Sequence, residues 1–242
     1  MEFIRKNGFV YFLLISIVLS ATFFLQKQAE NATSAAAAVG QEPLTILVDA
    51  GHGGEDGGAR SCTGAQESTL NLEIALRVND LYHLLGYPTK MVRSSDVSIH
   101  DAGCTTIAQK KESDLKNRVK LVNETPRALL VSIHQNQFSE SKYYGAQVFF
   151  APTTGSEALA KLTQEIFNTQ VDPSNHRAAK PSTAVYLMSH IRCTGILVEC
   201  GFLSNRAEEA KLHDAAYQKR IAAAICGSVS RYLTEGTETN EA

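Results

Sequence analysis

Two histidines and a glutamate in this sequence each follow a short apolar run, and residues of these types can bind a metal ion or move a proton. They are His52 after residues 45–48, His134 after 128–133, and Glu199 after 195–198. If the runs are parallel strands, their carboxyl ends meet at one edge of a sheet, where active sites gather. A lone histidine after a strand is more often structural, but three such residues together predict an active centre.

The segment that contains His52 is rich in glycine, reading Gly51-His52-Gly53-Gly54-Glu55-Asp56-Gly57-Gly58. It fails the dinucleotide fingerprint, because counting from Gly51 the sixth position is Asp56 and not glycine. It also lacks the Gly-Lys-Ser/Thr of a phosphate-binding loop. Glycines let a backbone fold tightly, and imidazole and carboxylate groups suit zinc. We therefore interpret the segment as a metal-binding loop.

A zinc hydrolase needs three protein ligands and one open position for water. His52 and His134 would supply two nitrogens. The third ligand is either Glu55, in a His-x-x-Glu arrangement, or Glu67, which directly precedes an expected helix, and the spacing alone leaves both open. Glu199 would then be the general base that takes a proton from water and passes it to the leaving amine.

The elements that must position these residues alternate between strands and helices. The apolar patterns predict strands at 45–48, 88–92, 128–133, 146–150, 185–188 and 195–198, and helices from Ser68 or Thr69 to about 85, from Ser113 to about 124, at 155–170 and at 217–233. Such alternation predicts a single α/β domain with a mostly parallel central β-sheet and helices on both faces.

The amino terminus has a different character from the body. Arg5 and Lys6 precede 20 uncharged residues, which is about 30 Å as a helix and matches a bilayer core. We expect residues 1–27 to be a signal peptide, cleaved at a small-residue site within 34–38, or an uncleaved membrane anchor. In both cases the protein is exported. Residues 28–43 read as a linker, 44–233 as the catalytic domain, and 234–242 as a disordered tail.

Composition excludes several classes of protein. The chain has 242 residues, is 44% hydrophobic and has a net charge of −2, which argues against collagen-like, disordered and nucleic-acid-binding proteins. Five cysteines without a Cys-x-x-Cys pair fit neither a disulfide scaffold nor a cysteine-only zinc finger. Residues 28–242 carry 20 basic and 24 acidic residues, so the body is mildly acidic.

Four ordered motifs carry a resemblance to a known family. They are residues 47–59, Glu67 before a helix, Ser132-Ile133-His134-Gln135-Asn136, and residues 198–205. Together they resemble the zinc-dependent N-acetylmuramoyl-L-alanine amidases that cleave bacterial peptidoglycan, over about 44–233. The resemblance implies that His52, Glu67 and His134 bind zinc and that Glu199 is catalytic. The position of Glu55 varies in that family, so the resemblance favours Glu67. The sequence departs from the family at Gln135 and Gln137, where alanine is common, which bears on substrate contacts more than on zinc.

Further segments are similar to one branch, the germination-specific amidases of the spore cortex. They are residues 114–123, 145–149, 172–177 and 186–188. This similarity implies removal of peptide from muramic acid as the first step towards muramic δ-lactam. The partners implied are the peptidoglycan substrate, a membrane through the N-terminal segment, and an accessory or activating protein. Nucleic acid is not among them. The protein would then be membrane-anchored, or secreted to the cell wall or the forespore intermembrane space.

Two other functions remain as alternatives. A zinc carboxypeptidase or endopeptidase on wall peptides would use Glu55 as a ligand, whereas a non-catalytic peptidoglycan-binding protein would have kept only the fold.

The roles of three residues near the expected site are also left open. Arg93 and Arg118 either line the cleft or form buried pairs with carboxylates. Asp49 either orients a ligand or makes a structural hydrogen bond.

Overall fold

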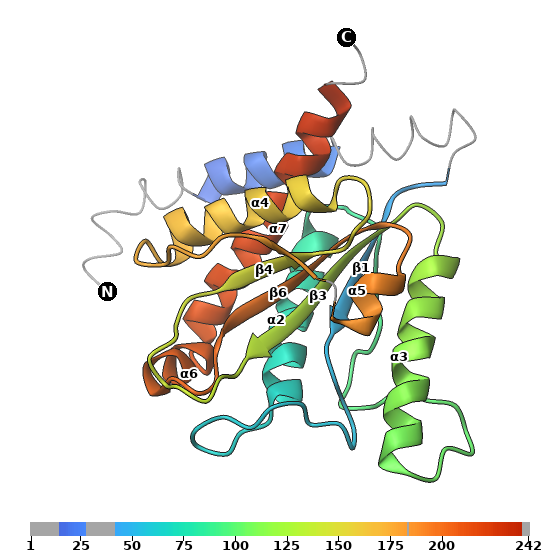
Figure 1. Cartoon of the computed structure of the whole chain (residues 1–242). Helices are drawn as coiled ribbons and strands as arrows, with labels where there is room; N and C mark the ends of the chain where they lie inside the picture. The colour runs from blue at the N-terminus through green and yellow to red at the C-terminus, as the bar shows by residue number, and fades with distance from the viewer. Residues whose placement is uncertain (1–14, 28–41, 183, 239–242) are drawn as a thin grey trace, which may run out of the picture.

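The computed structural model describes residues 15–27, 42–182 and 184–238 (Figure 1). Its strands form one six-stranded sheet in the order β2-β1-β3-β6-β4-β5. The strands are β1 (Thr45–Ala50), β2 (Thr89–Met91), β3 (Ala128–Asn136), β4 (Gln147–Phe150), β5 (Lys180–Pro181) and β6 (Thr194–Phe202). Strands β2, β1, β3 and β6 are parallel, whereas β4 pairs with β6 in the antiparallel sense. The predicted mostly parallel sheet is therefore confirmed.

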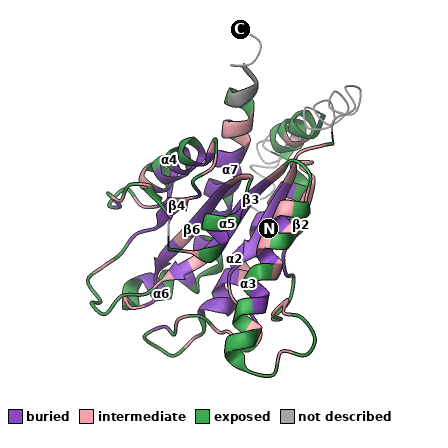
Figure 2. Cartoon of the chain, turned by 45° about the vertical axis from the view of Figure 1, so that its right-hand side comes forward, coloured by how far each residue is buried: buried purple, intermediate pink, exposed green. Residues whose placement is uncertain are grey.

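Helices cover both faces of this sheet. They are α2 (Glu67–Leu84), α3 (Ile107–Glu124), α4 (Ser156–Ile166), the π-helix η1 (Phe167–Val171), α5 (Tyr186–His190), α6 (Arg206–Leu212) and α7 (Ala215–Glu238). Helices α2, α4 and α7 share the larger hydrophobic core on one face, and α3 and α5 share a smaller core on the other. Figure 2 shows the strands buried between these two layers.

Side chains alternate in direction along each strand, so β1, β3 and β6 contribute residues to both hydrophobic cores. In β1, Ile46 and Val48 belong to the larger core, and Leu47 between them belongs to the smaller one. Because both faces are buried, β1 and β3 read as continuous apolar runs in the sequence. The loop after β1 lies at the carboxyl ends of the parallel strands, at the lower edge of the molecule in Figure 1.

One predicted strand is wrong. Residues 185–188 were expected to be extended, but helix α5 begins at Tyr186. Leu187 and Met188 are buried in the smaller core, where α5 packs against α3. A four-residue apolar run cannot distinguish a buried strand from a short buried helix, and tertiary packing decided here.

The predicted starts of two helices also differ from the structure. Helix α3 begins after Thr106, whose side chain accepts a hydrogen bond from the Gln109 backbone in a capping box. Ser113, the predicted cap, lies nearly two turns inside the helix, and its hydroxyl donates to Asp101 instead. Ser68 likewise lies within α2, which begins at Glu67 without a side-chain cap. Helix α6 and strand β5 were not predicted.

The two ends of the chain are described only in part. Residues 1–14 of the expected export segment, residues 28–41 of the expected linker and residues 239–242 lie outside the described residues. Residues 15–27 are helical. In the described part of the chain, no helix has both the length and the apolarity needed to cross a bilayer. Helix α7 extends to Glu238, so residues 234–238 of the expected disordered tail are helical.

Candidate active site

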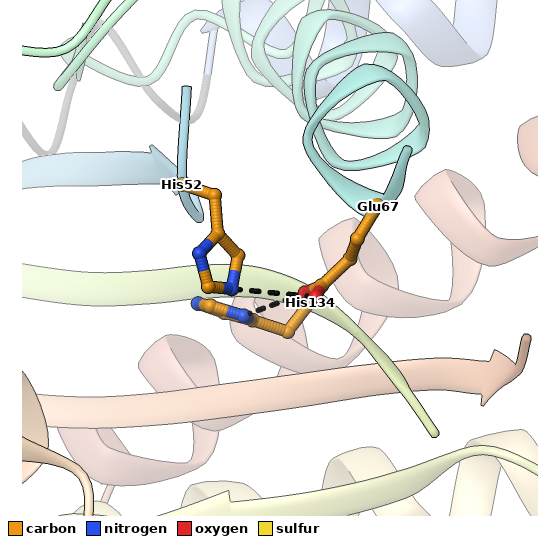
Figure 3. Close-up of side chains that lie close together, drawn as sticks. All are labelled: His52, Glu67 and His134. Atoms are coloured by element: carbon orange, nitrogen blue, oxygen red, sulfur yellow. Dashed lines mark hydrogen bonds and ion pairs between the residues drawn. The ribbon is translucent and has the colours of Figure 1, made fainter. Parts of the chain in front are cut away.

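The structure brings His52, Glu67 and His134 together from three different elements (Figure 3). His52 lies in the loop after β1, Glu67 is the first residue of α2, and His134 lies in β3. One potential ligand atom from each residue lies within 4.8 Å of the other two. Metal bonds of about 2 Å hold ligand atoms within about 4 Å of one another, so small side-chain shifts suffice to bind an ion.

The carboxylate of Glu67 is the hub of this group. Its Oε1 lies 3.0 Å from Nδ1 of His134, and its Oε2 lies 3.3 Å from Nε2 of His52. It also accepts hydrogen bonds from the backbone of Ala59 at 2.9 Å and from Asn71 Nδ2 at 3.1 Å. Burial opposes ionisation, but the two histidines outweigh it and hold the pKa of Glu67 far below its usual range. Glu67 is therefore an ionised ligand candidate.

His52 is oriented by a second carboxylate. Its Nδ1 lies 2.9 Å from Oδ2 of Asp56, which leaves Nε2 directed at Glu67. Burial disfavours the charged imidazole, yet the hydrogen bonds to Asp56 and Glu67 raise the pKa of His52 to about 9. A carboxylate on the far nitrogen is the usual support of a metal-binding histidine.

Glycines let the backbone approach these side chains. A Cβ atom on Gly51 would lie 2.1 Å from Nε2 of His134, and one on Gly58 would lie 2.6 Å from Oε2 of Glu67. Gly58 also has a φ of +67°, which glycine adopts without strain. The glycine-rich sequence is thus required by the close packing of the loop around the His-Glu-His group.

Two buried arginines, Arg93 and Arg118, donate hydrogen bonds to the backbone of the loop that carries His52. Arg118 pairs with Asp49 and Asp114, and its Nη2 donates to the His52 carbonyl at 2.7 Å. Arg93 instead donates to backbone carbonyls, among them Ala50 at 2.8 Å. Arg118 therefore forms the buried carboxylate pairs that were one of its two predicted options, whereas Arg93 does not. Neither arginine needs to line the cleft to fix the loop.

Asp49 is part of that buried network. Arg118 contacts its Oδ1, and the Ser132 hydroxyl donates to its Oδ2 at 2.6 Å. Burial raises the pKa of Asp49, but the Arg118 guanidinium, the Ser132 hydroxyl and His134 together outweigh it, so the net shift is downward. Asp49 thus makes a structural hydrogen bond at the strand end and supports the His52 loop through Arg118.

Glu55 lies apart from the His-Glu-His group. Its side chain is exposed and pairs with Lys110 at the start of α3. The neighbouring Lys111 pairs with Asp56 at 2.7 Å. The two lysines therefore tie the loop to α3, and Glu55 is engaged in a surface ion pair.

Glu199 lies beside His134, because β3 and β6 pair these two residues in register. Both residues lie within their strands, which continue to Asn136 and Phe202, rather than after them as predicted. The Oε2 atom of Glu199 is buried and has no hydrogen-bond partner among the described residues. Burial raises the pKa of Glu199 to about 7. Near neutral pH this carboxyl group can therefore both take up and release a proton.

Sequence reasoning missed the residues that support Glu67. Asn71 lies one turn further along α2, is fully buried, and donates both to Glu67 and to the Gly51 carbonyl. Gln135 donates to Asn71 through its side chain at 3.2 Å, and its backbone donates to Glu67. The i, i+4 spacing of Glu67 and Asn71 was the available signal. Gln135, at a position where the family commonly has alanine, thus supports Glu67 directly and through Asn71.

Comparisons with known proteins identify the family of the chain. Residues 46–231 match the N-acetylmuramoyl-L-alanine amidase family. The germination-specific N-acetylmuramoyl-L-alanine amidase of Bacillus subtilis (strain 168) is 36% identical over 193 residues, which cover 78% of this chain and 80% of that protein. The CwlD amidase from Clostridioides difficile, solved in complex with the GerS lipoprotein, is 38% identical with a TM-score of 0.76, over 79% of this chain and 98% of that one.

A second solved structure extends the agreement. The N-acetylmuramoyl-L-alanine amidase from Clostridium difficile 630 is 29% identical with a TM-score of 0.69, and the match covers 79% of this chain and 97% of that one. The family match runs through every strand of the sheet and both glutamates of the site. The chain therefore belongs to the N-acetylmuramoyl-L-alanine amidase family and is a hydrolase of that class.

Proposed function

We propose that this amidase depends on zinc, which His52, Glu67 and His134 would hold, and that Glu199 is its catalytic residue. The substrate bond would be the amide between N-acetylmuramic acid and L-alanine in peptidoglycan. The observation that carries the proposal is the buried Oε2 atom of Glu199, which has no hydrogen-bond partner in the described part of the chain and lies on the strand next to His134.

The residues fit zinc by their chemistry and their support. Two imidazole nitrogens and one carboxylate oxygen make a ligand set typical of catalytic zinc. Asp56 orients His52, and Asn71 orients Glu67, as outer hydrogen bonds do in zinc sites. When bound, zinc supplies a Lewis acid that polarises a carbonyl group and acidifies water.

Glu199 would carry the proton between the two halves of the hydrolysis. Water adds its oxygen to the lactyl carbonyl carbon and gives a proton to Oε2 of Glu199. The C–N bond then breaks, and Glu199 returns the proton to the nitrogen of L-alanine, which leaves as an amine. Burial raises the pKa of Glu199 above its ordinary value, to about 7 in the metal-free protein, and a carboxylate that burial makes more basic is a better acceptor of the proton from water.

The products of peptidoglycan digestion test this function. Purified full-length protein, supplied with zinc, is expected to release peptides that begin with L-alanine and to leave free muramic acid lactyl groups, as read by mass spectrometry. A carboxypeptidase or endopeptidase would instead release fragments cut within the peptide, and that result would overturn the assignment. The ion pair of Glu55 with Lys110 disfavours this alternative, which needs Glu55 as a ligand.

We further propose that the enzyme acts in the spore cortex, at the first step of muramic δ-lactam formation. The support is its 36% identity to a germination-specific amidase and its similarity to CwlD. It would be exported, and either secreted to the cell wall or the forespore intermembrane space or anchored to a membrane through residues 1–27. Because CwlD was solved with the GerS lipoprotein, an accessory protein is also proposed here.

The cortex assignment has its own test. A strain that lacks this protein should form cortex peptidoglycan without muramic δ-lactam, and a chromosomal copy of the gene should restore it. Unchanged δ-lactam in the deletion strain would contradict the cortex role while leaving the amidase chemistry intact.

A further inference from the structure

A pocket of about 210 Å³ opens next to the strand that faces Glu199. Its walls come from the segment before β4 and the segment before β5. The lining residues are Lys142, Tyr143, Tyr144, Asn175, His176 and Arg177. Two of them are cationic and none is acidic, although residues 28–242 have a net negative charge.

One buried residue, Gln147, links the lining of the pocket to the strand that carries Glu199. Gln147 of β4 lies opposite Glu199 of β6 in the antiparallel register, so their side chains share a face of the sheet. Oε1 of Gln147 accepts a hydrogen bond from Nη1 of Arg177 at 3.0 Å. Gln147 lies one strand spacing, about 4.8 Å, from Glu199, and Arg177 lies one hydrogen bond beyond Gln147. A chain bound at Glu199 therefore needs only about two extended residues to reach Arg177, which places the residue after L-alanine near it.

Arg177 forms no ion pair with a carboxylate in the described part of the chain, although the charge of Glu208 acts on it from nearby. Its Nε donates to the Tyr144 carbonyl at 2.7 Å, and its guanidinium lies 4.5 Å from the ring centroid of Phe202. No carboxylate among the described residues pairs with it. The nearby Glu208 is engaged elsewhere, because it accepts from the Gly145 backbone at 2.7 Å.

The environment of Arg177 suits an anion from outside. Its neutral partners fix the plane of the guanidinium while leaving its charge available to a carboxylate, which an arginine fork can bind with two hydrogen bonds. Lys142, which also lines the pocket, forms an ion pair with the exposed Glu140 and lies 5.4 Å from the ring centroid of Tyr143. Exposed ion pairs contribute little, so Lys142 can exchange that partner for a ligand.

We propose that this pocket binds a free carboxylate in the peptide part of the substrate, on the leaving-amine side of the cleaved bond, and that Arg177 makes the enzyme prefer acidic over amidated peptides. The inference rests on the proposed amidase function and names a feature of its substrate. A neutral sugar would not explain why the pocket is lined by two cationic side chains and by no acidic one.

Two synthetic muropeptides of equal sequence test the proposal. One carries a free carboxylate on the residue after L-alanine, and the other carries a carboxamide there. The wild-type enzyme should cleave the acid with a kcat/KM at least about tenfold higher, mainly through a lower KM. In Arg177→Gln the ratio between the two substrates should fall to near one, and Arg177→Lys should keep part of the preference. Arg231→Gln, the same loss of charge on the exposed face of α7, should keep the full ratio.

Binding separates this inference from the catalytic one. By calorimetry, the full-length protein should bind the free acidic peptide at least about tenfold more tightly than its amide, and Arg177→Gln should lose this difference. Equal binding of the two peptides by the wild type would overturn the proposal, as would an Arg177→Gln variant that weakens both substrates equally. A binding preference without cleavage would support the pocket and contradict the proposed function.

Discussion

The two sides of the active site treat a buried carboxylate in opposite ways. On the loop and α2 side, Glu67 receives hydrogen bonds from two histidines, a side-chain amide and the backbone, and its pKa is far below the usual range. On the β6 side, Glu199 has an oxygen without a partner, and burial raises its pKa to about 7. One residue type thus becomes either a strongly ionised carboxylate or a carboxyl group that titrates near neutral pH, according to the hydrogen bonds that the fold provides.

The largest expected effect comes from removing the anion. Glu67→Gln should lose metal binding, with zinc affinity reduced more than about 100-fold, because it removes a ligand and not merely the support of one. Zinc content after dialysis measures this loss. Glu55→Gln is the matched control and should retain zinc at the wild-type level. Loss of zinc in the Glu55 variant alone would reject the assigned ligands.

A smaller effect is expected beneath the loop that carries His52. Asp49→Asn leaves the buried Arg118 with one carboxylate fewer, which should lower the free energy of unfolding by about 3–5 kcal/mol. Urea denaturation measures the change. Glu112→Gln removes a carboxylate of an exposed pair on α3 and should change stability by less than about 1 kcal/mol. Equal effects of the two substitutions would show that the Asp49 network does not support the loop.

The orientation of His52 should matter less than the ligands themselves. Asp56→Ala removes the hydrogen bond to Nδ1 of His52 and should weaken zinc binding by about 10–100-fold. Titration against a competing chelator gives the affinity. Lys111→Met removes only the exposed partner of Asp56, so we expect a change below about threefold. If both variants bind zinc alike, Asp56 does not act through His52.

The smallest effect is a shift in titration. In metal-free protein the carboxyl carbon of Glu199, followed by NMR, should titrate at about pH 7, and a bound cation should lower that pKa. Because this folded-state pKa lies above the ordinary glutamate value of 4.5, protonation of Glu199 stabilises the metal-free fold fully below pH 4.5, and the contribution is lost as pH rises through about 7. A metal-free titration near pH 4.5 would remove the contrast with Glu67.

The central strands β1, β3 and β6 were predictable because most of their residues are buried. Strands β1, β3 and β6 read as continuous apolar runs, which only a sheet covered on both faces requires. The direction of β4 was not predictable, since a short strand carries no sign of its orientation. The helix at Tyr186 was missed because its apolar residues fit either structure, and contact with α3 decided between them.

Site residues were predictable where a histidine or glutamate follows the apolar run of a strand. His52, His134 and Glu199 stand out in the sequence because each follows an apolar run. Glu67 could not be chosen over Glu55 by spacing, and only the resemblance favoured it. The sequence did not single out Arg177 as a binding residue. Its hydrogen-bond partners among the described residues are neutral, and only the three-dimensional structure shows which groups contact it.

The proposed hydrolysis requires Glu199 to carry the proton from water to the leaving amine. Glu199→Gln keeps the size of the side chain and removes the exchangeable proton. The variant should retain zinc at the wild-type level, and its release of L-alanine-terminated peptides from muropeptides should fall by about 100- to 10,000-fold. Release within tenfold of the wild-type rate by the zinc-loaded variant would contradict the role assigned to Glu199.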